Sequence, residues 1–222
     1  MNTKNISLKT IISLLVPLIF LTACAAGQKE AVKPEEPAQM STLPVEEQVK
    51  QSQAAFSKIL DITMNEDRKS ALPKIEDSYS AIIRDYPDTP MAQEAYLRLI
   101  TISMEDYNPP KIERAESLYN DFISKYPRSP IRGAVEDGLM RFYYAKKNFD
   151  RLLIIIKPYI KEYISTGNIR SAFILFLYSE AKFHTGDLTE AKKGYRIIEQ
   201  RFPNTSEARA SANKLREMET IK

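Results

Sequence analysis

Apolar residues recur at spacings of three and four along most of the chain beyond residue 45, which is the spacing of one face of an α-helix. Prolines, glycines and short polar segments interrupt this pattern at regular intervals. The helical segments that it predicts most clearly are 45–63, 69–86, 172–183, 188–202 and 206–218. With only 6 glycines and no tryptophan, the chain is expected to be an ordered, all-α protein.

Three of the interruptions share a motif in which a proline follows an aromatic residue and precedes Ser or Thr by two positions. These prolines are Pro87, Pro127 and Pro203; 40 residues separate the first two and 76, twice 38, separate the last two. A degenerate copy is therefore expected midway, near Tyr163, where a helical run ends in Thr and Gly. Periods of about 34 to 40 residues are typical of stacked helix-turn-helix units.

Two copies also carry an alanine, a tyrosine four residues later and the proline eight residues beyond. The small alanine allows two helices to approach closely, and the tyrosine fills the space between hairpins. The two sets are Ala115, Tyr119 and Pro127, and Ala191, Tyr195 and Pro203. The expected repeats span 47–89, 90–129, 130–166 and 168–205, with a capping helix at 206–219.

The third repeat is the least regular. Its run Leu152–Ile156 is apolar nearly all round, which predicts a helix buried on both sides. A β-strand is the competing interpretation of such a short apolar run. Pro158 and the helical repeats on either side favour the helix.

The repeated positions match the second half of the tetratricopeptide repeat, and Gly186-Asp187 matches its usual turn. The first-half residues of that repeat are mostly replaced: Ser103 and Ser179 stand at its glycine position. The chain thus resembles tetratricopeptide-repeat proteins over about residues 47–219. The fold class that this implies is an all-α, tetratricopeptide-like α-solenoid of about four helical hairpins plus a C-terminal capping helix.

The first 23 residues have the pattern of an export signal, with a basic start and an apolar core, Ile11–Leu21, of only about one third to one half the length of a spanning helix. The four residues that end in Cys24 resemble the bacterial lipobox. Cys24 is the only cysteine, so it has no disulfide partner within the chain. The alternative is a buried free thiol behind an ordinary leader.

The lipobox resemblance implies that 1–23 is a lipoprotein signal peptide and that Cys24 carries lipid. Two or three acyl chains make a stable membrane anchor. Segment 24–46 contains three prolines and no apolar period, so it is expected to be a flexible tether before the repeat domain, 47–222. Ala25, where enterobacterial inner-membrane lipoproteins have Asp, favours by analogy the outer membrane, facing the periplasm. In a Gram-positive cell the protein would lie on the outer face of the plasma membrane.

Charge and composition argue against several functions. The formal net charge is +3, and Lys4 and Lys9 of the leader account for two of it, so nucleic acid is not an expected partner. His184 is the only histidine, and the chain lacks Gly-rich phosphate loops and Gly-x-Ser-x-Gly elbows. We expect no enzyme activity, no cofactor, no metal and no small-molecule substrate.

In tetratricopeptide arrays the first helix of each hairpin lines the concave surface and contacts the ligand. When the tetratricopeptide register is mapped onto this chain, Leu97, Asp137 and Phe173 are among the ligand-facing positions. The stripe is apolar and aromatic, which suits an apolar helix or an extended segment of a partner; alternatively, it is ordinary inter-helix core. The expected partner groove comprises Leu60, Met64, Ile100, Met104, Tyr107, Arg141, Tyr144, Phe176, Glu180 and Phe183.

A Tyr-Pro ending of the repeats behind a lipobox resembles the BamD group of outer-membrane β-barrel assembly lipoproteins and the C-terminal domain of the CpoB group. The resemblance implies a lipid-anchored periplasmic scaffold for other envelope proteins, with outer-membrane protein assembly as the first expectation. The alternative is a regulator or coordinator of peptidoglycan synthesis and cell division, or of pilus or secretion assembly.

Overall fold

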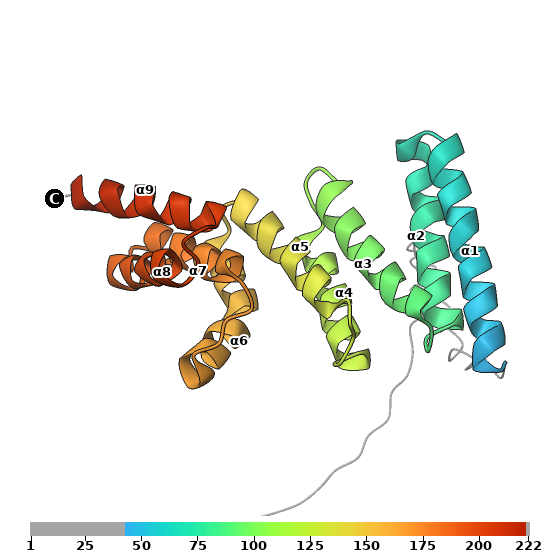
Figure 1. The fold of residues 1–222 in the computed structure, drawn as a ribbon. Helices are drawn as coiled ribbons and strands as arrows, with labels where there is room; N and C mark the ends of the chain where they lie inside the picture. The colour runs from blue at the N-terminus through green and yellow to red at the C-terminus, as the bar shows by residue number, and fades with distance from the viewer. Residues whose placement is uncertain (1–42, 221–222) are drawn as a thin grey trace, which may run out of the picture. The chain divides into compact units, whose positions relative to one another are not determined.

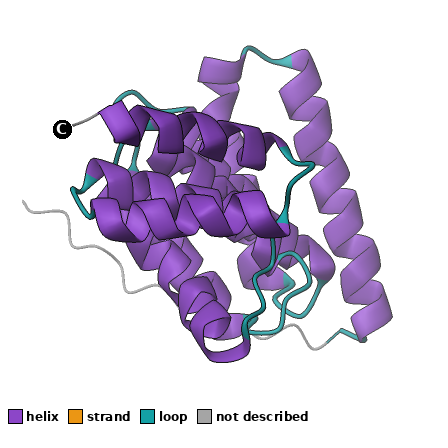
Figure 2. Ribbon diagram, turned by 60° about the vertical axis from the view of Figure 1, so that its left-hand side comes forward, coloured by secondary structure: helices purple, strands orange, loops and turns teal. Residues whose placement is uncertain are grey.

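The computed structural model describes residues 43–220. Over that range the chain folds into nine α-helices joined by short loops, and no strand occurs there (Figures 1 and 2). The helices are α1 Val45–Asn65, α2 Arg68–Asp85, α3 Pro90–Glu105, α4 Ile112–Lys125, α5 Arg132–Ala145, α6 Phe149–Thr166, α7 Ala172–His184, α8 Leu188–Arg201 and α9 Ser206–Thr220. The expected leader, Cys24 and most of the tether lie outside the described residues.

Helices adjacent in sequence pack as four hairpins, α1–α2, α3–α4, α5–α6 and α7–α8, and α9 packs on α8. The first helix of each hairpin also contacts the first helix of the next, and α9 continues this series by contacting α7. Such nearest-neighbour stacking defines a solenoid. The predicted all-α, tetratricopeptide-like array of four hairpins with a C-terminal helix is confirmed for the part of the chain that the structure describes.

Local sequence explains where several helices begin and end. Side chains at the N-caps accept hydrogen bonds from backbone amides two or three residues on: Thr89 from Ala92 at 3.2 Å and Asp187 from Glu190 at 3.2 Å. Gly167, at φ 72°, adopts the left-handed conformation that ends α6. The motif prolines lie two residues beyond the ends of α2, α4 and α8.

Small residues set how closely the helices of a hairpin approach. Ala115 and Ala191 have no solvent exposure, as the repeat pattern predicted. At Gly194 in α8, an added Cβ would lie 2.0 Å from Oγ of Ser179 in α7. The α7–α8 hairpin therefore depends on a glycine that the repeat pattern did not single out.

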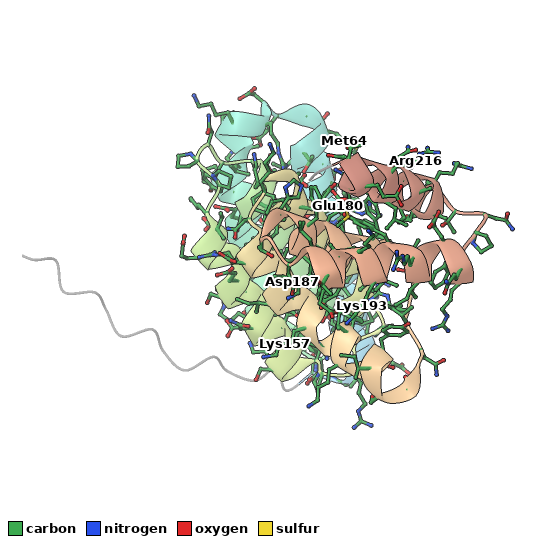
Figure 3. The ribbon with its side chains drawn as sticks, turned by 90° about the vertical axis from the view of Figure 1, so that its left-hand side faces the viewer. Met64, Lys157, Glu180, Asp187, Lys193 and Arg216 are labelled. Atoms are coloured by element: carbon green, nitrogen blue, oxygen red, sulfur yellow. The ribbon has the colours of Figure 1, made fainter. Side chains whose placement is uncertain are left out.

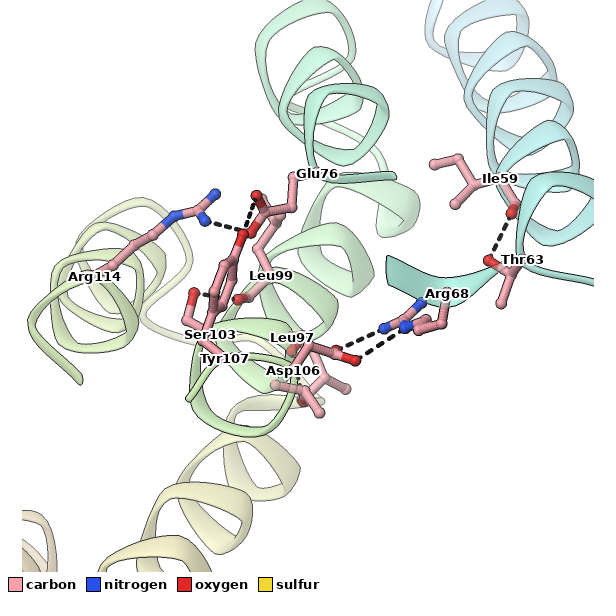
Figure 4. A network of polar contacts seen from close by, with 11 residues as sticks. Ile59, Thr63, Arg68, Glu76, Leu97, Leu99, Ser103, Asp106, Tyr107 and Arg114 are labelled. Carbon is pink, nitrogen blue, oxygen red and sulfur yellow. Dashed lines mark hydrogen bonds and ion pairs between the residues drawn. The ribbon is translucent and has the colours of Figure 1, made fainter. Parts of the chain in front are cut away.

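Two equivalent polar clusters connect successive hairpins. In the first, Glu76 of α2 accepts hydrogen bonds from the Tyr107 hydroxyl, at 2.8 Å, and from the Arg114 guanidinium of α4 (Figure 4). In the second, Glu116 of α4 accepts from the Tyr143 hydroxyl, at 2.7 Å, and from Arg151 of α6, at 2.8 Å. Each cluster fixes the second helix of one hairpin against the hairpin that follows.

The third hairpin corrects one expectation. Leu152–Ile156 lies in a helix, as predicted, and Leu152 and Ile156 have no exposure. Burial on both sides is wrong, because Ile154 is 68% exposed. The helix packs on α5 and α7, and no described helix covers its outer face.

Candidate binding surface

A cavity of about 390 Å³ opens between α5 and α7, the first helices of their hairpins, and the C-terminal helix α9. It is called the α5–α7–α9 pocket below. Its volume falls at the lower end of the range of about 300 to 1,000 Å³ that is common for ligand sites. Aromatic side chains dominate its wall, and one arginine and one glutamate lie at its edge. The lining residues are Arg141, Tyr144, Phe173, Phe176, Leu177, Ser206, Glu207 and Ala210.

Arg141 is the cationic group of this pocket. Its guanidinium carbon lies 4.2 Å from the centroid of the Phe173 ring, in the geometry of a cation–π contact. Within residues 43–220 it has no ion-pair or hydrogen-bond partner. An arginine held over a ring with all five of its N–H groups available is positioned to bind a carboxylate or a carbonyl of a partner.

Tyr144 is held in the wall by the buried carboxylate of Glu180. The Tyr144 hydroxyl donates to Oε2 of Glu180 at 3.0 Å, and the Tyr195 hydroxyl donates to Oε1 at 2.5 Å. Glu180 of α7 is only 3% exposed, and its carboxylate accepts hydrogen bonds from α5 and from α8. It therefore supports the pocket and does not face a ligand.

Burial and the charge of Glu180 both raise the pKa values of these two tyrosines. Desolvation is the larger cause in each case, and it combines with Glu180 to raise the pKa of Tyr144 to about 12. The pKa of Tyr195 is raised further, by burial and by its hydrogen bond to Glu180. Both hydroxyls thus remain protonated donors at physiological pH.

The C-terminal helix supplies one wall of the pocket. Thr205 caps α9 by accepting a hydrogen bond from the Ala208 amide at 3.1 Å, and Ser206, Glu207 and Ala210 then line the pocket. The sequence predicted α9 only as a polar cap. Its small and apolar residues, Ala208, Ala212 and Leu215, predict one packing face, but they do not indicate that Ser206, Glu207 and Ala210 line a cavity, so these wall residues were missed.

The structure brings together three of the predicted groove residues, Arg141, Tyr144 and Phe176, in one pocket. Ile100 and Met104 are instead buried, at 1% and 4% exposure, so they are core residues. The reason is that α3 packs against α1, α2, α4 and α5. For these two positions the alternative interpretation, inter-helix core, is correct.

The other predicted groove residues lie elsewhere. Leu60 lines a separate, more polar cavity of about 400 Å³ between α1, α2 and α3, and Met64 is 73% exposed. Tyr107 belongs to the Glu76 cluster described above. Phe183 is half-buried in the C-terminal core, with the Lys214 ammonium 4.8 Å from its ring centroid.

Within residues 43–220, no group of three or more His, Cys, Asp or Glu side chains could hold a metal ion. None of the helices there combines the length and the apolar character needed to cross a membrane.

Comparison with models of protein families finds no match, and the comparisons with characterised proteins and with solved structures find no significant one.

Proposed function

We propose that the protein is a lipid-anchored, non-enzymatic scaffold at the periplasmic face of the outer membrane, where it binds another envelope protein. The observation that carries this proposal is the α5–α7–α9 pocket, an aromatic cavity on the first-helix side of the array with an unpaired arginine at its edge. Aromatic and arginine side chains dominate the energetics of protein interfaces.

The chemistry of the pocket supports a segment of polypeptide as its ligand. Phe173, Phe176 and Leu177 offer apolar contacts, and Arg141 offers hydrogen bonds to a carboxylate or to main-chain carbonyls. A short apolar segment with an acidic group beside it fits both features. Such a segment, helical or extended, would lie across the first helices of the hairpins, as ligands of helical repeat proteins do.

The capture test uses Arg141→Glu in the lipidated full chain. Reversing the charge is expected to lower recovery of the partner by at least tenfold, since removing one member of a buried, hydrogen-bonded charge pair at an interface costs about 2–5 kcal/mol. Arg196→Glu on α8 is the matched control, because Arg196 is exposed and lies outside the pocket. Equal recovery by the two variants would contradict the proposal.

The anchor rests on Cys24 and is tested separately. Metabolic labelling with palmitate is expected to mark the chain, and Cys24→Ser is expected to abolish the label. Processing of the precursor should also be sensitive to globomycin. Labelling that persists after Cys24→Ser would contradict the anchor while leaving the pocket untouched.

Outer-membrane protein assembly is the envelope process that the sequence resemblance favours. Depletion of the protein should then reduce the amount of β-barrel proteins in the outer membrane. Normal barrel levels with defects in division, pili or secretion would instead support the alternative role as a regulator or coordinator of those processes.

A further inference from the structure

The exposed face of α6 differs in chemistry from the exposed faces of the other second helices. The exposed residues of α4 are all polar, and those of α8 and α2 are polar apart from Leu188 and Pro73. On α6, by contrast, Ile154 and Ile164 are 68% and 79% exposed. These two aliphatic side chains distinguish the outer face of α6 from the polar outer faces of the other second helices.

Helix α6 also extends beyond its neighbours. It has 18 residues, against 14 in each of α4 and α8. None of residues 157–166 is fully buried: Tyr159 and Ile160 pack against the core, and the outer side of this half of the helix is exposed, at the lower end of α6 in Figure 1. This half is accessible to a large flat surface as well as to a protein.

Two lysines lie between the isoleucines along the helix. Lys157, which is labelled in Figure 3, and Lys161 are exposed, and neither has an ion-pair or hydrogen-bond partner within the described residues. At 100° per residue, both lysines lie on the face that carries Ile154 and Ile164. The exposed Asp150 lies on the same face, one turn before Ile154 at the N-terminal end of the helix, and Glu162 lies about 80° away from Ile154. The part of the face between Ile154 and Ile164 thus combines two unpaired lysines with two aliphatic side chains.

We infer that this face of α6 binds the surface of an anionic phospholipid bilayer. Ile154 and Ile164 are ten residues apart, about 15 Å along the helix, so they form no contiguous patch of the kind that a protein partner covers. A bilayer interface accepts separated aliphatic side chains, and lysines between them reach the anionic headgroups.

This inference rests on the proposed anchoring in one respect. A lipid on Cys24 keeps the bilayer close, so the weak affinity of two isoleucines and two lysines is enough to orient the tethered array. Helix α6 then sets which side of the array faces the membrane. The α5–α7–α9 pocket does not include any residue of α6.

The test places a polarity-sensitive dye on the lipidated full chain, held by its anchor in vesicles. Ser165→Cys provides the attachment site, since Ser165 is exposed on the same face and the sulfur of Cys24 is blocked by lipid. Ser117→Cys, at an exposed position of α4, is the matched reporter. We expect a blue shift, and quenching by brominated acyl chains, only for the α6 reporter and only in phosphatidylglycerol-containing vesicles, compared with phosphatidylcholine.

Variants then identify the groups responsible. Lys157→Glu and Lys161→Glu are each expected to lower the membrane-contacting fraction about fivefold, and Ile154→Ser with Ile164→Ser roughly tenfold. The control pair, Leu188→Ser with Arg196→Glu on α8, should change nothing. Circular dichroism of each variant verifies folding.

Three outcomes would overturn the inference. One is equal emission of the α6 reporter in anionic and zwitterionic vesicles. Another is a shift that requires added envelope proteins, which would assign the face to a protein partner. The third is an unchanged signal in the lysine variants. Dye uptake by the chain without an introduced cysteine would instead count against lipidation of Cys24, and so against the proposed anchor alone.

Discussion

At the scale of single residues, the repeated tyrosines have a role beyond filling space. The Tyr119 hydroxyl donates to the buried Glu136 at 2.7 Å, as Tyr195 donates to the buried Glu180. The sequence predicted these tyrosines as spacers between hairpins but not their partners. Glu136 follows its tyrosine by 17 residues and Glu180 precedes its own by 15, so no fixed spacing reveals the pairs.

Removing one hydroxyl tests the contribution of such a pair. Tyr195→Phe is expected to lower the free energy of unfolding by about 1.5–3 kcal/mol, because a buried carboxylate loses a charge-assisted hydrogen bond. Urea denaturation measures the change. Tyr178→Phe is the control, since the Tyr178 hydroxyl forms no hydrogen bond within residues 43–220. A loss of the same size in both variants would show that the bond to Glu180 is not the cause.

The raised tyrosine pKa values predict a loss of stability at alkaline pH. An unfolded tyrosine titrates near pH 10, whereas burial raises the pKa of Tyr126 and of Tyr144 to about 12. The unfolded chain therefore releases protons that the folded chain keeps. Stability is complete below about pH 10 and falls above it, by up to about 1.4 kcal/mol per pH unit for each such tyrosine.

Denaturation at about pH 8 and pH 11 checks this slope. Tyr195→Phe should reduce it, because burial and Glu180 also raise the pKa of Tyr195. A free energy of unfolding that is equal at the two pH values would contradict the account.

At the scale of elements, the α7–α8 hairpin shows why a repeat motif is an incomplete guide. Ser179 looked like the loss of a consensus glycine, yet Gly194 on the facing helix supplies the missing space. The motif lists positions along the chain, so it does not show that residue 194 of α8 faces residue 179 of α7. In the α3–α4 hairpin, where Ser103 stands at the same motif position, Leu118 holds the place of Gly194.

This pairing predicts a reciprocal rescue. Gly194→Ala should destabilise the protein by about 1–3 kcal/mol through overpacking against Ser179, although alanine is the better helix former. Adding Ser179→Gly leaves only the Cα of residue 179, at 3.8 Å, and should restore part of the loss. Gly138→Ala in α5, with no atom within 4 Å, should be neutral or stabilising. Thermal unfolding compares the four chains, and the absence of any rescue would contradict the pairing.

The outer face of α6 marks another limit of prediction at this scale. An apolar run indicates a helix correctly, but whether both of its sides are buried depends on which helices exist to cover them. Ile154 has the same aliphatic character as Ile156, and only the position of α5 and α7 separates an exposed residue from a buried one.

At the scale of the whole molecule, the period of the prolines was enough to predict the array of hairpins. Only some of the ligand-facing positions expected from the tetratricopeptide register line the pocket. Arg141, Tyr144 and Phe176 lie in a pocket because α9 leaves space over α5 and α7, whereas Ile100 and Met104 of α3 are covered by four neighbouring helices. The residues occupy equivalent register positions in the two places, so the difference arises from helix packing that a repeat alignment does not include.

The central claim is that the α5–α7–α9 pocket holds another envelope protein, and crosslinking in living cells tests it most directly. A photoreactive amino acid at Ala210, in the pocket wall, should yield one discrete crosslinked protein, and Arg141→Glu should abolish the product. The same probe at Ser117 on α4 should yield none. Absence of a product from Ala210 at normal protein levels, or equal products from both positions, would contradict the claim.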